Sequence, residues 1–318
     1  MALLKKSILL LLAAVAFFLL LGIALTWRND KPVDELKARW AQPPSQFIAV
    51  AGMQVHVRDE GPRDDPVPIV LLHGTSASLH TWEGWAGALR GQRRVIRLDL
   101  PGFALTGPNP DNDYSLDSYV KVVTALLDQL GVRRFVVGGN SLGGGIAWSL
   151  AHAQPQRVDK LILVDASGYP PESGTTKLNI PLGFRLANMP VLKHLVRYTL
   201  PRGVVEQSVR SVYGHPDKVT PQLVDLYMDM ALREGNRVAL VRRIEQGYTG
   251  KSENLKTLAM PTLILWGGKD QLVPPEFALR FERDIKGSRL VMFDDLGHVP
   301  QEEDPARTVA EVKRFLGV

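Results

Sequence analysis

The stretch that most constrains the fold is a glycine-rich turn between a strand-like segment and a helix-like segment. The apolar run over residues 134–137 predicts a short buried strand, and apolar residues at helical spacing follow Ser141. Between them lies Gly139-x-Ser141-x-Gly143. The glycines let strand and helix approach closely, so the turn exposes the serine hydroxyl at a helix N-terminus. A glycine-rich turn could hold a serine by chance, but the strand before it and the helix after it favour a nucleophile.

Other strand-like runs alternate with amphipathic helical patterns along the chain. Helix starts are indicated at Ser115, a capping residue, and at Asp304-Pro305, a cap followed by proline at the first helical position. Such alternation predicts an α/β fold with a mostly parallel central sheet and helices on both faces. The expected strands cover residues 68–72, 94–98, 134–137, 160–164, 262–266 and 290–293, after a hairpin over residues 46–60.

One long segment interrupts this alternation. Between residues 167 and 257 we find helical patterns punctuated by prolines and no convincing core strand. We therefore expect a helical cap at residues 169–250, inserted into a catalytic core formed by residues 46–168 and 251–318.

The beginning of the chain predicts a membrane anchor over residues 1–28. Ser7 to Thr26 carries no charge, and about 20 apolar residues suffice to span a bilayer core of roughly 30 Å. Lys5 and Lys6 favour a cytoplasmic N-terminus, which would make the chain a single-pass inner-membrane protein with an extracytoplasmic, periplasmic catalytic domain. A cleaved signal peptide is the alternative, although its apolar core is usually shorter.

The expected anchor could also mediate self-association. It offers a route to a homodimer, although it shows no GxxxG-type face. Residues 29–45 form the expected juxtamembrane segment, where a helix starting at Pro32 places Val33, Leu36 and Trp40 on one side.

Composition excludes several kinds of chemistry. The 318 residues include no cysteine, which rules out disulfides, thiolate metal sites and a cysteine nucleophile. No cluster of His and Asp has metal-ligand spacing, so we expect no metal and no cofactor. The net charge of +5 is not gathered in a Lys/Arg run, which argues against nucleic acid and fits proximity to anionic lipid.

A serine nucleophile needs a base and an acid. Of the seven histidines, His298 follows the last expected strand on a loop and can reach the sheet edge where Ser141 lies. Asp270 lies on the glycine-rich loop after the strand at 262–266, which can curl towards His298. Asp165, at the end of the preceding strand, is the alternative acid. The order Ser–Asp–His is that of α/β-hydrolases.

Attack on a carbonyl also needs donors for the oxyanion. The backbone N–H of Leu142 lies at the helix start, and the N–H of Thr75 lies in the loop after the first parallel strand. We expect these two groups to form the oxyanion hole.

Several motifs together resemble the α/β-hydrolase superfamily from about residue 47 to residue 318. They are His73-Gly74, Trp82, Asp99-Leu100-Pro101-Gly102-Phe103, Gly139-Asn140-Ser141-Leu142-Gly143-Gly144, Trp266-Gly267-Gly268-Lys269-Asp270 and Gly297-His298. Within the superfamily, the chain resembles the branch that contains meta-cleavage C–C hydrolases, monoacylglycerol lipases and small bacterial esterases. The Asn140-Ser141 pair resembles C–C hydrolases, whereas an anchor with a cap resembles membrane-bound bacterial lysophospholipases and phospholipases A.

The expected activity follows from these features. A cap rich in apolar residues interspersed with Lys177, Arg185, Lys193, Arg197 and Arg202 could sit at an anionic lipid surface and admit acyl chains, or could be an ordinary cap with a solvated top. We expect a serine hydrolase of carboxylic esters, chiefly lipid acyl esters (phospholipid, lysophospholipid or monoacylglycerol). Hydrolysis of C–C bonds and non-catalytic binding remain the alternatives.

Overall fold

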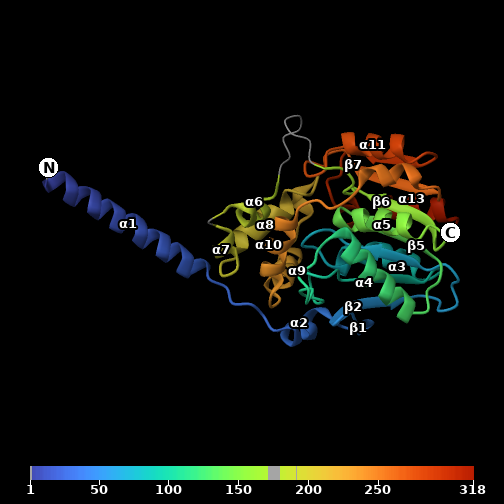
Figure 1. Cartoon of the computed structure of the whole chain (residues 1–318), viewed down its shortest axis with the longest axis horizontal. Helices are drawn as coiled ribbons and strands as arrows, with labels where there is room; N and C mark the ends of the chain where they lie inside the picture. The colour runs from blue at the N-terminus through green and yellow to red at the C-terminus, as the bar shows by residue number, and fades with distance from the viewer. Residues whose placement is uncertain (1, 171–179, 191) are drawn as a thin grey trace.

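The computed structural model describes residues 2–170, 180–190 and 192–318, and it is built on one eight-stranded sheet (Figure 1). The strand order is β1-β2-β4-β3-β5-β6-β7-β8. The strands are β1 (Ser45–Val50), β2 (Met53–Glu60), β3 (Ile69–Leu72), β4 (Val95–Leu98), β5 (Phe135–Asn140), β6 (Val158–Val164), β7 (Thr262–Gly267) and β8 (Arg289–Phe293).

The expected mostly parallel sheet is confirmed. β1 and β2 form the predicted antiparallel hairpin, and β2 pairs antiparallel with β4. All pairs from β4 to β8 are parallel. The loops that leave the carboxyl ends of β3, β5, β6, β7 and β8 therefore gather at one edge of the sheet, where ligands bind in open α/β sheets.

Helices cover both faces, as the sequence predicted. In β3 the buried side chains alternate: Val70 and Leu72 join one core cluster, and Ile69 and Leu71 join the other. The first cluster includes residues of α4 (Leu116–Gln129), α5 (Leu142–Ala153) and α11 (Glu276–Asp284). The second includes residues of the 3₁₀ turn η1 (Leu79–Trp82), α3 (Glu83–Leu89) and α13 (Pro305–Leu316).

The predicted caps form. The Ser115 side chain accepts a hydrogen bond from the N–H of Ser118, and the Asp304 side chain accepts one from the N–H of Arg307. These bonds fix the starts of α4 and α13. α13 is preceded by the short helix α12 (Pro300–Glu303).

Between β6 and β7, all the regular elements among the described residues are helices. They are α6 (Leu182–Asn188), α7 (Lys193–Val196), α8 (Arg202–Arg210), η2 (Pro216–Lys218), α9 (Pro221–Leu232), α10 (Asn236–Gln246) and η3 (Ser252–Thr257). Figure 1 shows α6 to α10 grouped beside the sheet, between it and the N-terminal helix. Residues 171–179 and 191, including Lys177 of the expected basic cap surface, lie outside the described residues.

The N-terminal helix α1 (Ala2–Thr26) extends away from the body of the protein (Figure 1). The sequence predicted that it spans a membrane, and this prediction is not supported. Among the residues that the structure describes, no helix is both long enough and apolar enough to cross a membrane.

The segment after α1 is bound to the cap rather than free. Trp27 stacks on Tyr198 with ring centroids 5.0 Å apart and forms a β-bridge with Thr199. α2 (Val33–Trp40) follows Pro32, as expected, and buries Leu36 in the core of the sheet. We call residues 27–40 the strap, because this segment connects α1 to both the cap and the core.

Candidate active site

Ser141 lies on a sharp turn between β5 and α5. Its backbone dihedrals are φ 54° and ψ −117°, a region that is costly for residues with a side chain. A Cβ on Gly139 would lie 2.1 Å from the carbonyl oxygen of Gly143, and one on Gly143 would lie 2.1 Å from that of Leu72. The two glycines of the motif are thus required by close backbone contacts, which hold the serine above the sheet edge.

His298 and Asp270 are brought together, as the sequence predicted. The Nδ1 atom of His298 lies 2.7 Å from Oδ2 of Asp270, and both side chains are buried. His298 follows β8 and Asp270 follows β7, so the pairing results from two adjacent parallel strands that end at the same edge. The other Asp270 oxygen accepts the N–H groups of Leu272 and Val273 at 2.8 and 3.0 Å, which fixes the carboxylate.

The alternative acid, Asp165, makes no hydrogen bond to His298 that the structure describes. It lies beside Asp270 instead: one atom each from Asp165, Asp270 and His298 fall within 4.8 Å of one another. Burial and then the negative charge of Asp270 raise the pKa of the Asp165 carboxyl well above its usual range. Among the described residues, these three side chains form the group that could hold a metal ion.

Two side chains that sequence reasoning missed hold the His298 loop. Asn140 donates from Nδ2 to the carbonyl oxygens of Val164 and His298, at 3.1 and 2.9 Å. Glu303 accepts the N–H of Gly297 at 2.8 Å. The position of Asn140 next to Ser141 could have indicated a role in the site. Nothing in the sequence indicated a role for Glu303.

Leu142 and Thr75, the expected oxyanion donors, lie at the start of α5 and in the loop after β3. Leu142 is the first residue of α5, where backbone N–H groups have no partner within the helix. Thr75 follows β3 by three residues and lines the same cavity as Ser141. No hydrogen bond from either N–H is described in the ranges given above, so both groups are available to a developing negative charge.

Ser141, His298 and Thr75 share a cavity of about 520 Å³ that is closed on one side by the cap. Its walls are largely apolar, which suits an alkyl or acyl group. Cap residues in the wall include Phe184, Leu186, Val205, Val209, Tyr227 and Leu240.

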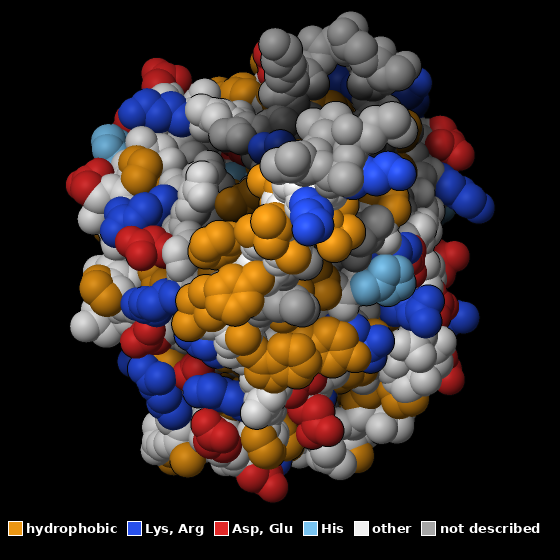
Figure 2. All heavy atoms as spheres, turned by 90° about the vertical axis from the view of Figure 1, so that its left-hand side faces the viewer, with side chains coloured by type: hydrophobic (Ala, Val, Ile, Leu, Met, Phe, Trp, Pro, Cys, Tyr) orange, Lys and Arg blue, Asp and Glu red, His pale blue; other side chains and the backbone are white. Residues whose placement is uncertain are grey.

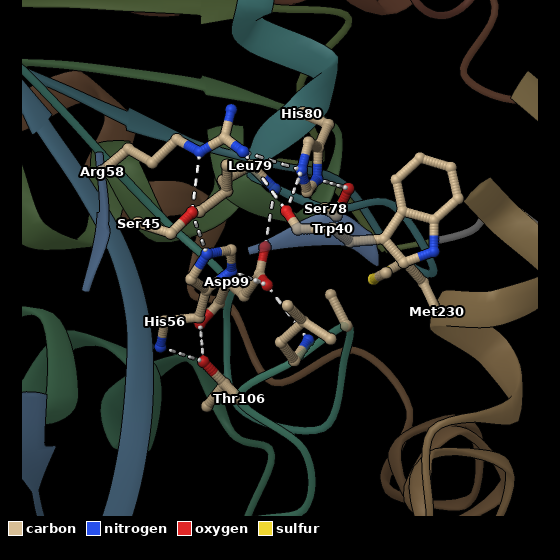
Figure 3. Close-up of polar contacts among 12 residues, drawn as sticks. Trp40, Ser45, His56, Arg58, Ser78, Leu79, His80, Asp99, Thr106 and Met230 are labelled. Carbon is tan, nitrogen blue, oxygen red and sulfur yellow. Dashed lines mark hydrogen bonds and ion pairs between the residues drawn. The ribbon is translucent and has the colours of Figure 1, made fainter. Parts of the chain in front are cut away.

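His56, which lies outside this cavity, has structural partners. Nδ1 of His56 lies 2.7 Å from Asp99 Oδ2, and Nε2 lies 2.9 Å from Ser45 Oγ (Figure 3). This Ser–His–Asp set resembles a catalytic one, but Ser45 Oγ also accepts from Arg58, and Asp99 also accepts backbone N–H groups. The cluster joins the β1–β2 hairpin to the loop after β4.

His80 and His73 have structural partners too. Nε2 of His80 lies 3.1 Å from the carbonyl oxygen of Trp40, which joins the cluster of Figure 3 to the strap. His73 contacts the carbonyl oxygen of Gly74 and the N–H of Leu100, as expected of a structural residue.

Comparison with known proteins agrees with this geometry. A model of the alpha/beta hydrolase family matches residues 69–312. An uncharacterized protein of Mycobacterium tuberculosis is 34% identical over 303 residues, covering 91% of this chain and 84% of that protein. The structure of a meta-cleavage product hydrolase from Pseudomonas fluorescens IP01 is similar, with 26% identity, a TM-score of 0.72 and coverage of 86% and 97%.

A second solved structure is similar over more of the chain. It is a membrane phospholipase A described as a bacterial virulence factor, with 23% identity, a TM-score of 0.74 and coverage of 100% of this chain and 98% of that one. At this identity the likeness concerns the fold. The family match, which covers residues 69–312, shows that the chain belongs to the alpha/beta hydrolase family.

Proposed function

We propose that this hydrolase cleaves carboxylic esters of lipid acyl groups through Ser141, His298 and Asp270. The observation that carries the proposal is the shared cavity: a serine on a strained turn and a histidine paired with a buried carboxylate face the same apolar space. An acyl chain fits such walls better than a polar substrate does.

In the proposed mechanism, Ser141 Oγ attacks the ester carbonyl while Nε2 of His298 takes the hydroxyl proton. Asp270 holds the imidazole through Nδ1 and stabilises the imidazolium that forms. The N–H groups of Leu142 and Thr75 stabilise the oxyanion. His298 returns the proton to the departing alcohol, and water activated by the same histidine then releases the carboxylic acid from Ser141.

We further propose that the chain works at the extracytoplasmic face of the inner membrane, bound to lipid through α1. Large apolar side chains on α1 are exposed, among them Leu9 at 71% and Phe18 at 68%. Figure 2 shows hydrophobic side chains gathered on the face from which α1 projects, with both basic and acidic side chains around them. Exposed apolar surface favours association with lipid, and the Lys and Arg side chains beside it favour anionic lipid. Sedimentation with vesicles of anionic lipid, compared with zwitterionic vesicles, tests this association.

Fatty-acid release from a panel of lipids tests the activity. Full-length protein in detergent is given phospholipids, lysophospholipids, monoacylglycerols and short soluble esters, with Ser141→Ala as the control. Release from lipids that depends on Ser141 supports the proposal. If only short esters are cleaved, the lipid preference is wrong.

Hydrolysis of a C–C bond is the second candidate. It is favoured by the similarity to the meta-cleavage product hydrolase and by the Asn140-Ser141 pair. It predicts turnover of vinylogous diketo acids and little turnover of esters. If a phosphonate probe fails to label Ser141, both hydrolytic proposals are wrong and a binding role is left.

A further inference from the structure

Asp165 is a buried acid that the proposed mechanism does not use. It follows β6 directly, and its side chain is completely buried. Its Oδ1 accepts the N–H of Gly267 at 3.0 Å, which fixes the carboxyl group against the end of β7. Its φ of 43° is uncommon for a residue with a side chain, and such conformations persist where the surrounding structure imposes them.

The second oxygen of Asp165 lacks a partner. Oδ2 is buried and accepts no hydrogen bond from the residues that the structure describes. An oxygen of Asp165 nevertheless lies within 4.8 Å of an oxygen of Asp270 and a ring nitrogen of His298. Two carboxyl groups this close and this buried do not both ionise, because their charges repel without water to screen them. One of the two therefore retains a proton.

The surrounding donors decide which carboxyl is neutral. Asp270 accepts two backbone N–H groups and faces the ring of His298, so hydrogen-bond partners already surround its oxygens. Asp165 has a single donor, the N–H of Gly267. Burial, the charge of Asp270 and that of Glu303 all raise the pKa of Asp165, so the proton belongs on Asp165.

We propose that Asp165 is a neutral carboxylic acid at neutral pH and donates a hydrogen bond from Oδ2 to the carboxylate of Asp270. This inference rests on the proposed function, in which Asp270 orients His298. Asp165 acts through Asp270 and is a positioning residue. It fixes the carboxylate without adding a second negative charge, and the bond satisfies the buried oxygen that otherwise has no partner.

Kinetics of two Asp165 variants test the role. Asp165→Asn keeps an acceptor for Gly267 and a donor for Asp270, so kcat should stay close to wild type. Asp165→Ala removes the donor, and kcat should fall about 10- to 100-fold with little change in KM, as for other small misplacements of a catalytic group. If D165N is as impaired as D165A, a negative charge on Asp165 is needed. If D165A is unimpaired, the hydrogen bond from Asp165 to Asp270 is not needed. Either result overturns the proposal.

Infrared difference spectroscopy tests whether the Asp165 carboxyl group is protonated, and it does not depend on enzyme activity. The wild-type minus D165N spectrum at pH 7 should contain the carbonyl band of a protonated carboxyl group, and only a carboxylate band would overturn the inference. Asp159→Asn is the matched control, because Asp159 lies on β6, the strand that Asp165 follows, and pairs with Arg134 at the surface. The band should appear even if no lipid ester proves to be a substrate, so the two proposals fail separately.

A metal ion among the three side chains is the competing explanation. The test is to add zinc to the full-length protein and, in parallel, to treat it with a chelator. Unchanged activity and unchanged infrared spectra support the hydrogen bond. Stimulation by zinc, or loss of activity on chelation, would overturn it.

Discussion

The Nδ2 atom of Asn140 lies 2.9 Å from the carbonyl oxygen of His298, and this bond ties the loop of the base to the residue before the nucleophile. The same amide donates to Val164 at the end of β6. One side chain therefore connects the ends of β5 and β6 with the loop after β8, and we expect the spacing of the proposed serine and histidine to depend on it.

Replacing Asn140 with Ala should lower kcat about 10- to 100-fold, because the His298 loop loses its tie and small displacements of a base are costly. The carbonyl oxygen of His298 also loses its donor, whereas that of Val164 keeps the N–H of Ser141, so the free energy of unfolding should fall by about 1–3 kcal/mol. Steady-state kinetics and urea unfolding measure both effects.

Asn140→Asp separates shape from hydrogen bonding, because the carboxylate has the same size and cannot donate. It should be at least as impaired as Asn140→Ala. If the Ala variant keeps wild-type kcat, the tie is not needed for catalysis.

The sheet, and the edge at which the site forms, could be predicted because strands and parallel connections leave strong local patterns. Ser141, Asp270 and His298 each follow such a strand, so topology alone brings them to one edge. Their chemical roles remain predictions that the proposed kinetics will test.

The supporting contacts could not be predicted, since they depend on which carbonyl or N–H group comes near a side chain after folding. Glu303 lies in a short polar helix with no sign that it would accept backbone N–H groups of two loops. In the strap, the sequence predicted the helix that follows Pro32, but it did not predict the contacts with the cap, because these are long-range in sequence.

Backbone strain at Ser141 gives a stability prediction. Its φ of 54° with ψ of −117° lies in a region that glycine adopts freely and other residues pay about 1–3 kcal/mol to occupy. Ser141→Gly should therefore be inactive yet more stable than Ser141→Ala, by about 1 kcal/mol after the entropy that glycine adds to the unfolded chain.

Thermal unfolding of the two variants measures the difference. Ser149→Gly is the matched control within α5, the helix that follows Ser141, where glycine should destabilise by about 0.5–1 kcal/mol. Equal melting temperatures for the two Ser141 variants would show that the turn relaxes without the hydroxyl.

His80 makes stability depend on pH. Burial lowers its pKa to about 4 from an ordinary value of 6.5, and the nearby Arg58 also disfavours a second ring proton. Between these values the unfolded chain binds a proton that the folded chain does not, so stability falls as pH falls. The loss between pH 7 and pH 5 should be about 2 kcal/mol from this group.

Urea unfolding at both pH values tests this, with His80→Asn as the comparison. The variant is expected to lose its own contacts at every pH, so the informative quantity is the difference between pH 7 and pH 5. That difference should shrink by about 2 kcal/mol relative to wild type. An unchanged difference would mean that His80 takes a proton in the folded state without cost.

Asp229 holds the strap to the cap. Its carboxylate contacts Lys31 Nζ at 2.9 Å, Arg39 Nη1 at 3.0 Å and Trp40 Nε1 at 2.9 Å, and the residue is only 5% exposed. Asp229→Ala leaves these donors without their buried acceptor, and loss of one partner from a buried ion pair typically costs about 3–5 kcal/mol. Because Lys31 and Arg39 are partly exposed, we expect a loss nearer the lower value.

Limited trypsin digestion of the full-length chain measures whether the strap detaches. In the Asp229→Ala variant, cleavage after Lys37 and Arg39 should be faster than in wild type. Asp225→Ala is the matched control one turn earlier on α9, because Asp225 pairs with Arg39 and Arg202 at the surface and should contribute about 0–1 kcal/mol. If both variants are cleaved at the wild-type rate, the strap is held by Trp27, Leu36 and the backbone bonds to the cap, and Asp229 is not its main attachment.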